Sequence, residues 1–485
     1  MASYPNVMLV VMDTTRADDA FNPAVAPALS DISEEGTKVT EAVSAAPWTL
    51  PSHASLLTGT HPSKHGTHAD HERLDEALPT LPELFRDTGY ETVCVSNNTW
   101  LSTESGFSRG FDSFQQMWQL VQSTNALSEL VDMTEERRFK AVGRKLLEGN
   151  PLANIVNTLY RFRADERADD GAERTTRWIR RWLAERERDQ PFFLLANYLE
   201  PHLEYRPPRR LAERYLPDSH TYQEALEVPQ QPWEYLTGHV TLDDDAFRAL
   251  RGLYRAEVAY LDEQLAELKR LLVEAGEWED TILVITADHG ENIGDHGLMD
   301  HQYCLYDTLI HVPLVLHGGA FSGGKDLTDL VSLVDIAPTL LDEAGIDAQQ
   351  ARREFQGRSF HPQSNTQPRE FVVSEYMAPQ PSMEALECHV GDVPDHIYQL
   401  DRSLRAIRTA DYKLIRGSDG TTELYNLAVD SRETTNIAEA NTELVADLTG
   451  KLDRWLGTFE QATTDGEVSI GEKRRKQLEE LGYIR

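Results

Sequence analysis

The residue types that could do chemistry gather where two expected strands end. Asn6–Met12 is a short run, apolar from Val7 onward and typical of a buried strand in a parallel sheet, and Asp13 follows it directly. Thr281–Ala287 is a second such run, followed by Asp288 and His289. The carboxyl ends of parallel strands meet at one edge of a sheet, where open α/β sheets place their active sites. Two carboxylates and an imidazole suit one divalent cation, with Zn²⁺ or Mn²⁺ favoured over Ca²⁺ or Mg²⁺ by the nitrogen ligand.

A hydroxyl group stands at the start of a third element. The segment from Thr49 to Gly59 predicts a helix with Thr49 at its N-cap and Pro51 in the first turn. Backbone N–H groups at the positive end of a helix can hold phosphate or sulfate. A hydroxyl placed there beside a dication can be deprotonated and attack phosphorus or sulfur. The same position equally suits a threonine that only caps the helix.

The elements that must position these groups alternate between helical and strand patterns, which predicts an α/β fold with a parallel sheet between helices. We expect a catalytic domain over residues 1–348, with a charged, mostly helical insertion at 115–190. Beyond it, residues 349–485 predict a small antiparallel subdomain with a terminal helix, because short alternating strands recur there.

Composition limits the partners. The 485 residues include 47 Lys and Arg against 81 Asp and Glu, a net charge of −34, which disfavours nucleic acids and anionic membrane surfaces. This acidity is typical of halophile proteins from an acidic proteome, and an ordinary acidic enzyme fits equally. No run approaches the ~20 apolar residues of a membrane span. Three dispersed cysteines and no visible secretory signal predict a cytoplasmic protein, and the oligomeric state stays open.

Four segments in order resemble the sulfatase family of the alkaline-phosphatase superfamily. They are PNVMLVVMD (5–13), TLPSHASLLTGTHPSKHG (49–66), ITADHGENIGDHG (285–297) and YKLIRGSDGTTELYNLAVDSRETTNIA (412–438). The resemblance implies a large mixed, mostly parallel sheet between helices, with a small antiparallel C-terminal sheet. It also implies a metal-dependent ester hydrolase that acts on anionic small-molecule or glycan esters.

The chain departs from the family pattern at its nucleophile. Family sulfatases have Cys-x-Pro-Ser-Arg, in which the cysteine becomes a formylglycine; here that position is Thr49, and His53 replaces the Arg that helps hold the nucleophile. One carboxylate of the family's Asp-Asp pair is missing, because Thr14 follows Asp13.

The substrate-facing positions also differ. A family lysine aligns near Asn97, so Asn97, Asn98 or Thr99 is left to bind an oxyanion. Pro201-His202 matches a family histidine that contacts the substrate or leaving group, and His301 takes the place of a later lysine.

These departures predict an enzyme that cleaves phosphate esters or diesters through Thr49, with His202 or His301 protonating the leaving group. Asp13, Asp288, His289 and Thr49 would hold the single cation. A second metal is not expected, and its candidate ligands are Glu200, His202, Glu204 and His301. The alternatives are a sulfatase that works without formylglycine, a phosphotransferase onto a glycan or soluble acceptor, and an inactive fold that binds an anionic glycan.

Overall fold

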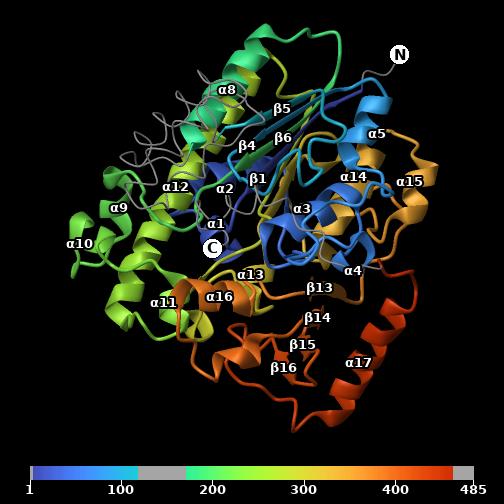
Figure 1. Ribbon diagram of the computed structural model, residues 1–485. Coiled ribbons are helices and arrows are strands. Elements are labelled where there is room, and N and C mark those ends of the chain that lie inside the picture. The colour runs from blue at the N-terminus through green and yellow to red at the C-terminus, as the bar shows by residue number, and fades with distance from the viewer. Residues whose placement is uncertain (1–3, 118–170, 463–485) are drawn as a thin grey trace, which may run out of the picture.

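A mixed sheet of eight strands lies at the centre of the computed structural model, which describes residues 4–117 and 171–462 (Figure 1). In spatial order its strands are β11 (Lys325–Leu327), β2 (Thr37–Val39), β10 (Leu314–His317), β7 (Thr281–Thr286), β1 (Asn6–Met12), β6 (Phe192–Tyr198), β4 (Glu91–Ser96) and β5 (Ser113–Gln116).

The middle of this sheet is parallel. β1 pairs in parallel with β6 and β7, and β4 continues the same direction on β6. β10 runs antiparallel to both of its neighbours, which makes the sheet mixed. The register sets Val11 beside Thr286, so Asp13 and Asp288 leave the sheet at the same edge. The predicted fold class is confirmed.

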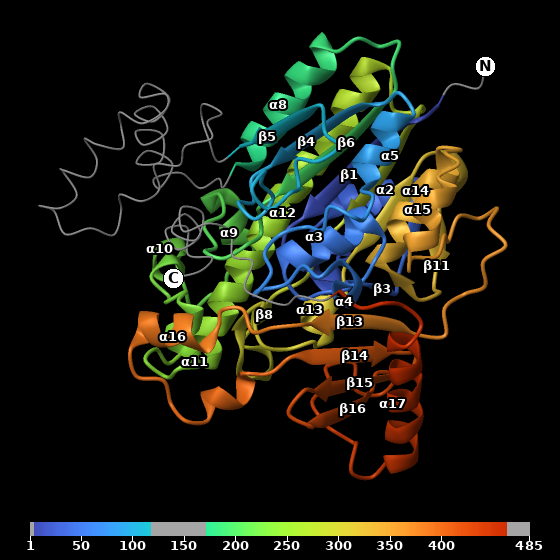
Figure 2. The same ribbon diagram turned by 45° about the vertical axis from the view of Figure 1, so that its right-hand side comes forward.

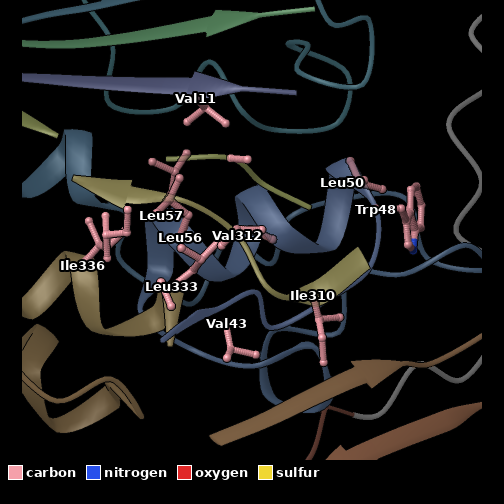
Figure 3. Close-up of a cluster of buried hydrophobic side chains, with 14 of the residues drawn as sticks. Val11, Val43, Trp48, Leu50, Leu56, Leu57, Ile310, Val312, Leu333 and Ile336 are labelled. Atoms are coloured by element: carbon pink, nitrogen blue, oxygen red, sulfur yellow. The ribbon is translucent and has the colours of Figure 1, made fainter. Parts of the chain in front are cut away.

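Helices cover both faces, because alternate residues of each buried strand point to opposite sides. Val7, Leu9 and Val11 of β1 face a core shared with three helices, α3 (Thr49–Thr58), α5 (Leu81–Asp87) and α14 (Ile336–Glu343). Figure 3 shows this core, in which Leu56 and Leu57 of α3 lie among Val11, Val312 and Leu333. The other face of β1 packs against four helices, α2 (Pro27–Glu35), α8 (Ala172–Glu185), α9 (Arg209–Tyr215) and α12 (Asp244–Ala275).

A second, antiparallel sheet of four strands lies below the first (Figure 2). Its strands are β13 (Val372–Tyr376), β14 (Leu404–Arg408), β15 (Tyr412–Gly417) and β16 (Thr422–Asn426), and α17 (Thr442–Leu456) packs on one of its faces. The opposite face joins the core of the large sheet. The expected C-terminal sheet and helix are therefore present, whereas the division at residue 348 stays a prediction. Most of the expected 115–190 insertion, residues 118–170, lies outside the described residues.

Two observations bear on the surroundings of the protein. Within residues 4–117 and 171–462, no helix is both long and apolar enough to cross a membrane. Cys94 and Cys304 are buried and Cys388 is exposed, and all three thiols are free. The expected cytoplasmic location stays a prediction.

A buried ion cluster fastens the small sheet to the large one. Lys413 of β15 is fully enclosed, and its Nζ lies 2.7 Å from Asp307 Oδ1 and 2.5 Å from Glu433 Oε1. Asp307 begins α13 (Asp307–Ile310), and the carbonyls of Thr308 and Leu309 in that helix accept hydrogen bonds from the amides of Glu291 and Gly290. The C-terminal sheet thus supports the segment that follows His289.

We expect Lys413→Ala to lower the free energy of unfolding by about 3–5 kcal/mol, because it leaves the buried Glu433 carboxylate without its cation and Asp307 with Arg408 alone. Urea denaturation measures the change. Lys451→Ala is the control, since the Lys451–Asp447 pair is largely exposed and should contribute less than about 1 kcal/mol. Equal effects of the two substitutions would show that the buried cluster does not hold the sheets together.

Candidate functional site

Asp13, Asp288 and His289 meet at the carboxyl edge of the large sheet. One ligand atom from each lies within 4.8 Å of the others, and all three side chains are fully buried. His289 Nε2 is 3.7 Å from Asp13 Oδ1 and 3.5 Å from Asp288 Oδ2. The structure therefore brings together the three side chains that the two strand ends predicted.

The hydrogen bonds of this group leave a place for a cation. His289 Nδ1 donates to the carbonyl of Gly290, 2.9 Å away, so its Nε2 presents a lone pair to the two carboxylates. Asp13 Oδ1 and Asp288 Oδ2 are buried and accept no hydrogen bond from any described residue. Three electron-rich atoms that face one another without a proton between them fit a divalent cation.

Thr49 adds a hydroxyl to this group. Its Oγ1 lies 3.4 Å from His289 Nε2, and it accepts a hydrogen bond of 3.2 Å from Asn98 Nδ2. The same amide donates to Asp13 Oδ2 over 2.5 Å, so Asn98 links the hydroxyl to the first carboxylate. The helix begins one residue earlier than expected: Trp48 has the extended backbone of an N-cap, and Thr49 is the first helical residue. Thr49 is therefore not the N-cap residue, and its hydroxyl contacts His289 and Asn98 instead.

Buried polar contacts hold α3 against the strand ends. The hydroxyls of Ser44 and Ser52 donate to the carbonyl of Asp288 over 2.5 and 2.7 Å. His53, one turn after Thr49, donates from Nδ1 to the Thr49 carbonyl over 3.0 Å and lies 3.5 Å from Asp288 Oδ2. These contacts fix the direction of the first helical turn relative to the carboxylates.

The charge states reflect burial. Burial and the neighbouring Asp288 charge raise the pKa of Asp13 well above its usual range, and burial raises the pKa of Asp288. Burial and the charge of His301 lower the pKa of His289, and burial lowers that of His53, so both rings are neutral near pH 7.

A second group lies beside the first and consists of Glu291, Asp300 and His301. His301 Nδ1 is 2.5 Å from Asp300 Oδ1 and 3.5 Å from Glu291 Oε1. Burial would lower the pKa of His301, but these two carboxylates raise it well above its usual value. Burial would raise the pKa of Asp300, but the neighbouring His301 lowers it to about 2. Burial raises the pKa of Glu291 to about 7.

His202 connects to this second group. Its ring lies edge-on to that of His301, with centroids 5.2 Å apart, and the His301 ring is 4.5 Å from that of His289. His202 Nδ1 donates to the Leu203 carbonyl over 2.6 Å. Burial and the charge of His301 lower the pKa of His202 to about 4, so Nε2 carries no proton near pH 7.

Three further candidates lie apart from the two groups. The Asn97 amide donates to Thr175 of α8 over 3.2 Å, so it turns toward that helix while Asn98 turns toward Asp13. Glu200 accepts a hydrogen bond from the Ala172 amide, and Glu204 pairs with Arg206 at the surface. The substrate contact expected of Asn97 or Asn98 stays a prediction.

Sequence analysis missed two members of the second group, Glu291 and Asp300. A signal was present, because the dipeptide Asp-His occurs at 288–289 and again at 300–301, and Glu291 follows the first dipeptide after one glycine. The pairing of β8 (Asn292–Ile293) with β9 (Met299–Asp300) brings the two dipeptides together. Periodicity could not reveal that pairing, since each strand is only two residues long.

Comparison with known proteins decides the family. The family model described as Sulfatase matches residues 5–346, and one described as N-sulphoglucosamine sulphohydrolase, C-terminal, matches residues 294–458. The chain belongs to the sulfatase family. The resemblance that the four sequence segments carried is confirmed.

Individual relatives of this sulfatase-family chain are distant. Arylsulfatase K of Homo sapiens is 24% identical over 479 residues, covering 93% of this chain and 82% of the relative. Choline-sulfatase of Rhizobium meliloti (strain 1021) is 24% identical over 459 residues, covering 90% and 82%. Among solved structures, the phosphonate monoester hydrolase of Agrobacterium radiobacter superposes with a TM-score of 0.66 at 20% identity, covering 93% of this chain and 95% of that one.

Removing divalent ions should destabilise this sulfatase-family protein, because buried carboxylates would then face each other without a cation. An ion at 100 times its Kd contributes about 2.7 kcal/mol, so a chelator should lower the Tm measured by calorimetry. The chelator should lower the Tm of Asp288→Asn by less than it lowers the Tm of the wild type. Asp262→Asn is the control, because Asp262 accepts hydrogen bonds at the start of α2, outside both groups. If the chelator leaves the Tm of the wild type unchanged, the protein does not bind a stabilising cation.

Proposed function

We propose that this chain is a metal-dependent hydrolase of phosphate monoesters or diesters, with Thr49 as its nucleophile. The observation that carries the proposal is the Thr49 hydroxyl itself. It stands where Asp13, Asp288 and His289 converge, Asn98 donates to it, and it does not cap its helix.

The choice of phosphorus over sulfur follows from the residue at this position. A threonine has no hydrated aldehyde through which a bound sulfate could be expelled, so a threonyl sulfate must be cleaved by direct attack of water. A threonyl phosphate is a more tractable intermediate, because in-line attack by water at phosphorus returns the free hydroxyl. The phosphonate monoester hydrolase that shares this fold supports the view that the fold accommodates hydrolysis at phosphorus.

Asp13, Asp288, His289 and Thr49 would hold the divalent cation. Their orphaned oxygens and the fixed His289 tautomer fit such an ion, with Zn²⁺ or Mn²⁺ preferred for the imidazole ligand. When bound, the ion would supply the positive charge that favours the alkoxide form of Thr49 and offsets charge on the ester.

The protein groups account for the remaining tasks. Thr49 Oγ1 gives its proton to water and bonds to phosphorus while the bond from phosphorus to the ester oxygen breaks, and His202 or His301 supplies a proton to the departing oxygen. Asn98 holds the hydroxyl and Asp13 in fixed relation. His202 offers an unprotonated Nε2, which suits the acceptance of a proton from the water that attacks the phosphothreonine. The ring of the predicted alternative, His301, has its centroid 4.5 Å from that of His289.

Sulfate ester hydrolysis is the second candidate, because the named relatives are an arylsulfatase and a choline-sulfatase. A phosphotransferase would use the same phosphothreonine and differ only in the acceptor. The group of Asp13, Thr49, Asp288 and His289 argues against an inactive, glycan-binding fold, since random loss would not leave one coherent set of ligands.

A panel of four substrates tests the proposal: an aryl phosphate, a phosphate diester, a phosphonate monoester and an aryl sulfate. We expect the highest kcat/KM for a phosphorus ester, and a loss of at least about 10³-fold in Thr49→Ala, because the attacking oxygen is gone. Thr49→Ser should retain most of the activity, since it restores a hydroxyl.

Thr58→Ala is the matched control at the other end of α3, where the hydroxyl donates to the Ala54 carbonyl. It should leave the rates within a few-fold of the wild type. If the aryl sulfate is cleaved fastest in the wild type, and Thr49→Ala abolishes that activity, the sulfatase alternative replaces the phosphoesterase proposal.

A further inference from the structure

The second group of ligand side chains is built by a short hairpin. β8 and β9 pair antiparallel with Asn292 opposite Asp300, which sets Glu291 close to Asp300 and His301. One ligand atom from each of these three residues lies within 4.8 Å of the others. The exposed fractions are 0% for Glu291, 8% for Asp300 and 9% for His301. The group is therefore largely shielded from bulk water.

The Glu291 carboxylate is an independent sign of a missing ligand. It is fully enclosed, and neither of its oxygens accepts a hydrogen bond of ordinary geometry from a residue in the described ranges, although the His301 ring and the Tyr205 hydroxyl face it and lower its pKa against burial. The one ion partner of its side chain among those residues is His301, whose Nδ1 is 3.5 Å from Oε1. Enclosing a carboxylate with so little compensation is strongly unfavourable, so this side chain fits a site that normally contains a cation.

The charge of the whole site points the same way. Four buried carboxylates line it: Asp13, Asp288, Glu291 and Asp300. In the described part of the chain none of the four pairs with a lysine or an arginine, and their ion partners are all histidines. One dication neutralises only two of the four charges. An anionic ester must bind here as well, which requires more positive charge than one ion and one imidazolium supply.

We propose that Glu291, Asp300 and His301 hold a second divalent cation beside the one at Asp13, Asp288 and His289. The rings of His289 and His301, one from each group, have centroids 4.5 Å apart, so the two sites are adjacent. Two carboxylates and an imidazole again favour Zn²⁺ or Mn²⁺. This proposal departs from the single cation expected from the sequence, and of the ligands considered there it keeps only His301.

The second cation also has a consequence for proton transfer. A cation on His301 takes that imidazole out of acid–base chemistry and leaves His202 as the histidine that exchanges protons with water or the leaving group. Two cations would together offset the charge of the four carboxylates. This consequence rests on the proposed function, whereas the metal content of the protein does not.

Metal counting tests the proposal without an activity assay. The full chain is loaded with Zn²⁺ or Mn²⁺, dialysed to remove excess ion, and analysed by inductively coupled plasma mass spectrometry. We expect two ions per chain in the wild type and one in Glu291→Gln. Glu343→Gln is the matched control, because it alters another nearly buried carboxylate beside a histidine, 2.9 Å from His361 Nε2, outside both groups. It should retain two ions.

A wild type with one ion, or a Glu291→Gln variant with an unchanged count, overturns the second site but leaves the proposed function in place. A wild type with no ion overturns both. If Glu291→Gln does not fold by circular dichroism, Asp300→Asn replaces it, since asparagine tolerates the left-handed backbone that residue 300 adopts, with φ of 71°. One ion per chain in that variant supports the proposal, and two overturn it.

Discussion

The structure depends on a repulsion that protein groups alone do not resolve. Asp13 and Asp288 aim carboxylate oxygens at the same point as the lone pair of His289 Nε2, and all three are cut off from water. Such a group is unfavourable when both carboxylates are charged and nothing positive lies between them, so the fold must hold these side chains firmly in place. The Gly290 carbonyl that fixes the His289 tautomer is part of the same requirement.

The surrounding elements meet this requirement at several levels. The parallel register of β1 and β7 brings the two aspartates to one edge. The Ser52 hydroxyl connects α3 to the end of β7, and the Ser44 hydroxyl connects the segment before α3 to the same carbonyl. Asn98 then joins Thr49 to Asp13. The C-terminal sheet contributes from the other side through Lys413 and Asp307, which hold the helix that receives the amides of Gly290 and Glu291. Both sheets therefore support the site.

Much of this arrangement could be predicted from the sequence, and the features that could not be predicted have identifiable physical reasons. Apolar runs that end in Asp13 and in Asp288-His289 predict the first ligand group, because strand direction and burial follow from pattern. Asn97 and Asn98 could not be separated, since adjacent residues point to opposite sides and the side depends on the exact strand end. Glu291 and Asp300 were not predicted, because a hairpin of two-residue strands and the left-handed backbone of Asp300 bring them together. Neither the hairpin nor the left-handed backbone leaves a periodic pattern in the sequence.

The central claim is that Thr49 carries the transferred group, and trapping that group tests it most directly. The protein is mixed with an aryl phosphate, quenched in acid within its first turnovers, digested and analysed by mass spectrometry. The account predicts one added phosphoryl group on the peptide that contains Thr49, and none when an aryl sulfate replaces the phosphate. A sulfated Thr49, or turnover of the phosphate with no modified threonine at any quench time, would contradict it.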